Sequence, residues 1–83
     1  MSDKEVYEKV VKILGPYAKD KEALANVSES TNILEGLKVN SARLVDVVLQ
    51  FEDEFGIEIA DEDVDGITTV GDCIRVISQK AAA

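Results

Sequence analysis

Apolar residues recur at helical spacing near the start of the chain, at i, i+4, i+7 and i+8: Val6, Val10, Ile13 and Leu14. This spacing places the four side chains on one face of a helix. Ser2 stands before the run with Glu5 three positions later, the spacing of a capping box in which each side chain satisfies a free backbone N–H. Gly15-Pro16 ends the pattern. An amphipathic helix between Ser2 and Gly15 is therefore predicted.

A second apolar face follows Ser41, with side chains at i, i+4, i+7 and i+11: Leu44, Val48, Phe51 and Phe55. Gly56 comes next, and glycine is favoured directly after a helix because it adopts left-handed backbone without strain. The pattern predicts a helix that opens at Ser41 and closes at Gly56.

Two shorter signals lie near the end of the chain. A turn of helix is expected from Asp61 to Gly66. Thr69 and Asp72 have the spacing of capping residues for a last helix, which frays through residues 81–83 and turns four apolar side chains inward: Val70, Cys73, Ile74 and Ile77. On such a face Cys73 is interpreted as a small buried hydrophobe, since no histidine stands beside it to make the thiol reactive.

Residues 15–40 show no sustained period, and so long a connection is uncommon unless it packs its own side chains. An extra turn of helix is expected between Asp20 and Val27. Spaced apolar residues could hold the rest of this loop against the helices: Leu24, Val27, Ile33, Leu34 and Leu37. The sequence predicts an all-α fold, a small four-helix bundle with a long first loop and a short third helix, as one domain over residues 1–83.

Acidic residues are concentrated in one part of the chain. The net charge is −8, from 17 acidic and 9 basic residues, and residues 46–72 hold ten of the acids and none of the bases. This balance repels phosphate backbones and anionic membranes, so we expect neither a nucleic-acid partner nor stable membrane insertion. The cluster favours a face that binds something basic, while an acidic surface kept for solubility explains it equally well.

The chain has no histidine and one cysteine. Without histidine it lacks the commonest general base and every Ser-His or Cys-His pair, so we do not expect an enzyme. One cysteine cannot form an internal disulfide, which favours a cytoplasmic location. No stretch approaches the ~18 apolar residues of a membrane span, and the N-terminus lacks a signal-peptide core.

Ser41 is the strongest candidate for chemistry. Its hydroxyl would stand exposed at a helix start, where backbone N–H groups and the positive end of the helix dipole converge and stabilise a phosphate ester. Asn40 and Ser41 as ordinary N-cap residues explain the same pattern. The local residues alone leave both interpretations open.

From residue 33 to residue 77 the chain resembles the acyl carrier protein family. Four runs at fixed distances from Ser41 carry the resemblance: residues 37–41, 44–59, 61–63 and 67–74. The resemblance implies that a phosphopantetheinyl transferase attaches 4′-phosphopantetheine from coenzyme A to Ser41. Acyl groups would then be carried as thioesters to enzymes of fatty-acid, lipid or polyketide-type metabolism.

The resemblance also implies where partners and cargo bind. A monomer is expected to present the helix after Ser41 to basic docking patches of acyl-transferring or acyl-activating enzymes, through these residues: Ala42, Arg43, Val45, Asp46, Leu49, Gln50 and Asp53. Acyl chains would lie between helices, against four apolar walls: Val48, Phe51, Ile67 and Ile74.

Three positions depart from the family's usual pattern. Asn40-Ser41-Ala42 replaces Asp-Ser-Leu, Arg43 stands where an acid is common, and Lys38 replaces the glycine after the loop leucine. The changes remove two negative charges and add a positive one on the face that modifying enzymes read. We therefore expect a specialised carrier with dedicated partners.

Two other functions remain open on the sequence. The run from Asp61 to Gly66 matches the first half of an EF-hand loop, D-x-D-x-D-G, with Asp72 at position 12, so a calcium-binding helical adaptor is the alternative. Against it, Asp72 is shorter than the usual bidentate glutamate, and no second loop follows. A protein-interaction bundle without a prosthetic group is also possible, because a fold does not fix function.

Overall fold

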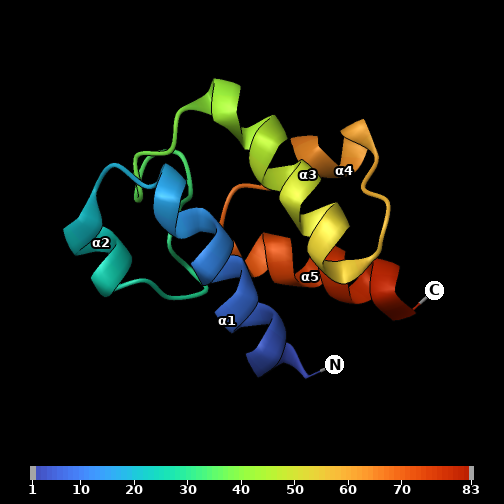
Figure 1. The fold of residues 1–83 in the computed structure, drawn as a ribbon. Coiled ribbons are helices and arrows are strands. Elements are labelled where there is room, and N and C mark those ends of the chain that lie inside the picture. The colour runs from blue at the N-terminus through green and yellow to red at the C-terminus, as the bar shows by residue number, and fades with distance from the viewer. Residues whose placement is uncertain (1, 83) are drawn as a thin grey trace.

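The computed structural model describes residues 2–82, which form an all-helical fold (Figure 1). Five α-helices and two 3₁₀ turns occur in these residues: α1 (Asp3–Leu14), η1 (Gly15–Tyr17), α2 (Lys21–Ala25), η2 (Ser41–Arg43), α3 (Leu44–Phe55), α4 (Asp61–Asp65) and α5 (Val70–Ala82). One isolated bridge joins Asn32 and Thr69, and no strand occurs within the described part of the chain. The all-α prediction is confirmed, and α2 is the extra turn expected between Asp20 and Val27.

The predicted helix ends are formed by the expected residues. The Ser2 hydroxyl accepts a hydrogen bond from the Glu5 N–H at 3.2 Å. At the start of α5, the Thr69 hydroxyl accepts from the Asp72 N–H at 3.2 Å, while the Asp72 carboxylate accepts from the Thr69 N–H at 3.0 Å. Gly56 ends α3 with φ +63°, in the left-handed region. These local signals could be read from sequence because each partner lies within one helical turn.

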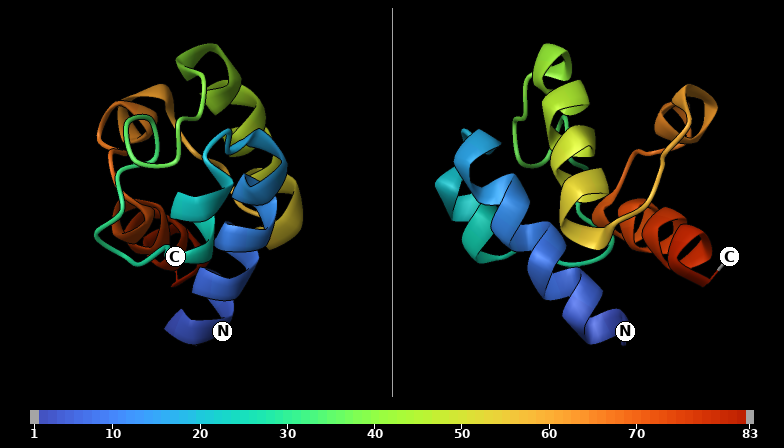
Figure 2. Two further views of the ribbon diagram at one scale, coloured as in Figure 1. Left: turned by 90° about the vertical axis from the view of Figure 1, so that its left-hand side faces the viewer. Right: turned by 45° about the vertical axis from the view of Figure 1, so that its right-hand side comes forward.

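Helices α1, α3 and α5 surround the core, with α2 and α4 on opposite sides of them (Figures 1 and 2). The helices bury these side chains: Val6, Val10 and Leu14 from α1, Val47, Val48 and Phe51 from α3, and Val70, Cys73, Ile74, Val76 and Ile77 from α5. The predicted faces are confirmed, although Ile13, Leu44 and Phe55 are only partly buried. No helix of residues 2–82 is long and apolar enough to cross a membrane.

The long first loop is held by its own side chains, as expected, but not by all of those expected. Ile33 and Leu37 are fully buried, and Leu24 and Val27 are partly buried. Leu34 is 37% exposed, so its predicted role in the core is wrong. The chain turns tightly here, because the N–H groups of residues 36 and 37 both bond the carbonyl of residue 32, and this turn carries Leu34 outward.

Backbone hydrogen bonds join the same loop to the start of α5. The Val70 N–H donates to the Thr31 carbonyl at 3.1 Å, and the Gly71 N–H donates to the Glu29 carbonyl at 2.8 Å. These are first-turn N–H groups that have no partner inside their own helix. The loop therefore caps α5, and its path toward Ser41 is fixed.

Candidate functional site

The segment that leads into Ser41 is anchored on both sides of Lys38. Leu37 and Val39 are buried, at 0% and 3% exposure. Lys38, which lies between them, and Asn40, which follows, are exposed. The Leu37 carbonyl accepts from the N–H of residue 20 at 3.2 Å, and the Val39 N–H donates to the carbonyl of residue 33 at 3.3 Å. Two buried side chains and two backbone bonds therefore place Ser41 at the surface.

Lys38 has φ +59°, the left-handed backbone conformation. A residue with a Cβ atom is destabilised there by about 1–2 kcal/mol, whereas glycine is not. This explains physically why the family's pattern has glycine at the position, and Lys38 keeps the same turn under strain.

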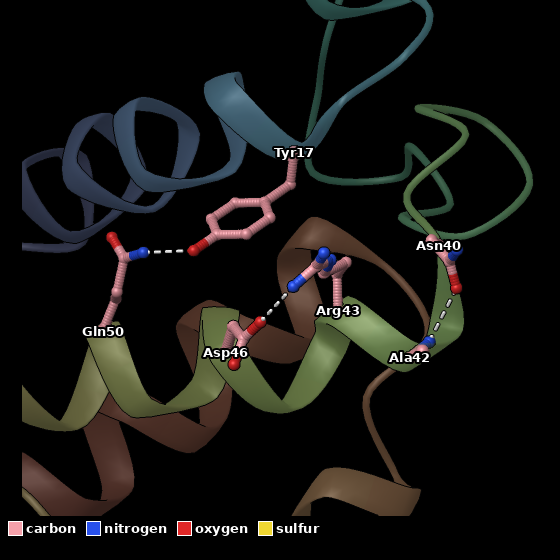
Figure 3. A network of polar contacts seen from close by, with 6 residues as sticks. All are labelled: Tyr17, Asn40, Ala42, Arg43, Asp46 and Gln50. Carbon is pink, nitrogen blue, oxygen red and sulfur yellow. Dashed lines mark hydrogen bonds and ion pairs between the residues drawn. The ribbon is translucent and has the colours of Figure 1, made fainter.

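Asn40, rather than Ser41, caps the helical segment that follows. Its side-chain Oδ1 accepts from the Ala42 N–H at 2.9 Å, and its backbone carbonyl accepts from the Arg43 N–H at 2.8 Å (Figure 3). Ser41 begins the tight turn η2, and regular α-helix starts only at Leu44. The predicted helix start is therefore three residues early, because the Asn40 carbonyl closes a shorter ring to Arg43.

The Ser41 hydroxyl is suited to carry a phosphate ester. Ser41 is exposed, and its hydroxyl makes no hydrogen bond with any group in residues 2–82. The expected cradle of backbone N–H groups is incomplete, however, because Asn40 already engages those of Ala42 and Arg43. The exposed Ser41 hydroxyl fits the phosphopantetheine ester, while the N–H groups of Ala42 and Arg43 are already engaged by Asn40.

The first turns of α3 carry the expected partner-binding residues on the surface. Val45 and Leu49 are 60% and 56% exposed, which is unusual for apolar side chains of this size. Asp46 lies beside them and forms an ion pair with Arg43, from Nη1 of Arg43 to Oδ2 of Asp46 at 3.2 Å (Figure 3). Arg43 therefore adds a positive charge to the expected docking surface and also neutralises its nearest acid, Asp46.

Gln50, which is also expected to belong to the docking surface, has a hydrogen-bond partner within the protein. Its Nε2 donates a hydrogen bond to the hydroxyl of Tyr17 in η1 (Figure 3). Tyr17 was not predicted from the sequence, because a contact across 33 residues leaves no local pattern. Asp53, one helical turn further on, is exposed as expected.

A groove of about 290 Å³ lies between α3 and α4. Its apolar walls and acidic rim are formed by these residues: Val45, Val48, Leu49, Ile59 and Val64, with Glu52, Asp61 and Asp65. The Glu52 carboxylate accepts from the Ile59 N–H at 2.9 Å, which holds the segment before α4 against α3. Of the four expected cargo walls, Val48 lines this groove, whereas these three do not: Phe51, Ile67 and Ile74. All four side chains are buried.

Two carboxylates of the proposed calcium loop, those of Asp63 and Asp72, have other partners. Asp63 pairs with Lys80 at 3.0 Å, and this contact and the Ala60 N–H lower the pKa of its carboxyl. The pKa of Asp72 is also lowered, first by the N–H groups of residues 69 and 68 and then by Arg75. No group of three potential metal ligands comes together within residues 2–82. The structure gives no support to the calcium-binding alternative.

Cys73 lies in the core, as its position on the apolar face of α5 predicts. It is 1% exposed, and burial, with a smaller contribution from Asp72, raises the pKa of its thiol to about 12. A thiol with that pKa holds its proton at neutral pH and is a poor nucleophile.

The comparisons with known proteins agree with this geometry. The family model described as "Phosphopantetheine attachment site" matches residues 7–77. The acyl carrier protein of Lactobacillus acidophilus is 37% identical over 78 residues, covering 93% of this chain and 94% of the relative. That of Thermotoga maritima is 35% identical over 79 residues, covering 95% of each.

Solved structures of acyl carrier proteins have the same fold. The protein from Enterococcus faecalis superposes with a TM-score of 0.78 at 36% identity, over 96% of this chain and 99% of that one. The crystal structure of the Thermotoga maritima protein superposes with a TM-score of 0.80 at 33% identity, over 99% of this chain and 93% of that one. The chain belongs to the acyl carrier protein family. It is a carrier of acyl groups on 4′-phosphopantetheine and not an enzyme, and the alternative of a bundle without a prosthetic group is thereby wrong.

Proposed function

We propose that Ser41 carries the phosphopantetheine arm, within a single carrier domain formed by residues 1–83. The observation that supports this most strongly is that the Ser41 hydroxyl is exposed and free of hydrogen bonds within residues 2–82, directly after a loop that the buried side chains of Leu37 and Val39 anchor. The other hydroxyls of the loop hydrogen bond to one another or to nearby backbone: Ser28, Ser30 and Thr31. Ser41 is therefore the single attachment site.

The thiol of the arm supplies the chemistry of a carrier, since it forms thioesters with acyl groups. The chain's own part is to hold the Ser41 oxygen outward and to present docking contacts beside it. The α3–α4 groove offers an apolar surface that shields an acyl chain from water, through Val45, Leu49 and Val64 among others. No residue of the chain is required to break or form the thioester.

Intact mass spectrometry tests this proposal after incubation with coenzyme A and a broad-range phosphopantetheinyl transferase. The wild-type chain should gain the mass of one arm, and Ser41→Ala should gain none. Ser28→Ala is the matched control and should be modified as fully as wild type. A full arm on Ser41→Ala would refute the proposal.

We further propose that dedicated partners read the surface next to Ser41. The proposed contacts are Ala42, Arg43, Val45, Asp46, Leu49, Gln50 and Asp53. The Arg43–Asp46 ion pair supports this, since it cancels a negative charge where a basic docking patch would otherwise be attracted. Charge complementarity of this kind changes association rates more than affinity.

Initial rates of apo-to-holo conversion by a housekeeping-type transferase test the partner proposal. Arg43→Asp should speed conversion, mainly at low salt, because it removes a repelling charge and releases Asp46. Ala42→Leu should add a gain that salt does not change, because it adds apolar contact area. Arg75→Asp makes the same charge change at a similar ion pair on α5 and should have little effect. Wild-type conversion as fast as that of an ordinary carrier would contradict specialisation.

We also propose that the chain acts in the cytoplasm as a monomer. The reduced Cys73, buried and without a partner thiol, is consistent with a reducing compartment. Fractionation and light scattering would test the two statements separately.

A further inference from the structure

A second hollow is lined by residues on both sides of Ser41 in the chain, Asn40 and Arg43. Its volume is about 360 Å³, and it lies between η1 and the start of η2. Six residues line it: Pro16, Tyr17, Ala18, Lys19, Asn40 and Arg43. Ser41 does not line the hollow itself, but it stands in the chain between two residues that do, Asn40 and Arg43.

The hollow carries two positive charges on an otherwise acidic protein. Lys19 is exposed and forms no ion pair within residues 2–82. Arg43 bonds the Asp46 carboxylate through its Nη1 atom. A guanidinium has five N–H donors, so several N–H groups of Arg43 remain available for an anion. Asp46 contacts Arg43 but not Lys19, and its bond holds the Arg43 side chain in place.

An anion on Ser41 has few backbone donors to rely on. Asn40 occupies the N–H groups of Ala42 and Arg43, which a phosphate at a helix start would normally use. Cationic side chains nearby are then the groups of the protein that can stabilise the phosphate beyond its hydration by water. Lys19 and Arg43 are the two cationic residues that line the hollow.

We propose that Lys19 and Arg43 form a seat for the phosphodiester that links the arm to Ser41. This rests on the proposed attachment at Ser41. The seat pairs one negative charge with two cations from segments far apart in sequence, the loop after η1 for Lys19 and η2 for Arg43. The seat holds only the base of the arm, near the residues that follow η1, and leaves the rest of the arm free to carry an acyl chain to the α3–α4 groove.

Phosphorus NMR of the holo protein tests the seat directly, with Lys19→Gln and Arg43→Gln as variants. Lys4→Gln is the matched control, because it removes the same charge at the start of α1, at the opposite end of the molecule from the start of α3 (Figure 1). The ³¹P resonance should shift in both seat variants and stay in place in the control. In wild type it should move toward the variants' position as salt is added.

Thermal unfolding of apo and holo forms gives a second readout. The holo form of wild type should melt higher than the apo form, and Lys19→Gln should lose about 1–5 °C of that difference, as expected for an exposed ion pair in a domain of this size. The seat would be overturned if wild type and all three variants had the same ³¹P chemical shift and the same difference in melting temperature between apo and holo forms.

Loading the arm separates two sources of negative charge. If dependence on Lys19 occurs only with a carboxylate-ended acyl group and not with the bare arm, the seat binds cargo and the phosphate assignment is wrong. Intact mass is recorded for every sample. A missing arm refutes attachment itself, whereas a full arm without dependence on Lys19 refutes only the seat.

Discussion

The Nε2 of Gln50 in α3 donates a hydrogen bond to the hydroxyl of Tyr17 in η1. This contact joins the expected docking helix to the turn that ends α1. It also means that Gln50 is held by the protein itself before any partner arrives. Tyr17 thereby belongs to the surroundings of Ser41 although it stands 24 positions earlier in the chain.

The Tyr17–Gln50 bond should contribute measurably to stability. Tyr17→Phe removes the acceptor and should lower the free energy of unfolding by about 0.5–1.5 kcal/mol. Urea unfolding of Tyr17→Phe, Gln50→Ala and the double variant gives the coupling between the two residues. If the two single effects simply add, the hydrogen bond contributes nothing in solution.

Lys38→Gly should stabilise the fold. The backbone of Lys38 is left-handed, and removing its Cβ relieves about 1–2 kcal/mol of strain, partly offset by the greater freedom of glycine in the unfolded chain. A net gain of about 0.5–1 kcal/mol is expected from chemical denaturation. Lys38→Ala is the control, because it removes the charge and keeps the Cβ, and it should give no such gain. Equal effects of the two variants would show that charge, not backbone strain, matters there.

Gly36 and Gly66 should respond in opposite ways to alanine. A Cβ at Gly36 would lie 2.5 Å from the Asn32 carbonyl oxygen, inside the turn that carries Ile33 into the core, so Gly36→Ala should destabilise by about 2 kcal/mol or more. Gly66 has φ −86°, and its nearest contact would be an ordinary 3.6 Å. Gly66→Ala should therefore raise the unfolding free energy by about 0.4–1 kcal/mol. Two losses of similar size would contradict this account of the turn.

Acid should weaken the cap at the start of α5. The backbone N–H groups of residues 69 and 68, with Arg75, hold the pKa of Asp72 below its ordinary value of 3.8. The unfolded chain therefore takes up the proton more readily, and the stabilisation present above that value is lost as pH falls through the lower folded pKa. Unfolding free energies measured over this acid range should fall less steeply for Asp72→Asn. An equally steep fall in wild type and in Asp72→Asn would refute the cap's role.

Much of the fold follows from signals that act within one helical turn. The pairs Ser2 with Glu5 and Thr69 with Asp72, together with Gly56, mark helix ends that the structure has where they were expected. The apolar spacing also gave the buried faces of α1, α3 and α5. Such local features need no knowledge of what packs against them.

Contacts made across the chain could not be predicted in this way. The Tyr17–Gln50 bond and the exposure of Leu34 both depend on the path of the long loop, which has no period of its own. Asn40 as an N-cap residue was one of the interpretations that the sequence left open, but only the structure shows that this cap engages the N–H groups of both Ala42 and Arg43. The position of the candidate serine could be predicted, whereas its charged surroundings required the structure.

Localising the arm by trypsin digestion of the holo protein tests the central claim most directly. Cleavage after Lys38 and after Arg43 releases residues 39–43, in which Ser41 is the sole hydroxyl-bearing residue. Fragment masses of this peptide should place one phosphopantetheine on Ser41, with the peptide of residues 22–38 unmodified. An arm found on that other peptide, which contains Ser28, Ser30 and Thr31, would contradict the assignment of Ser41 as the attachment site.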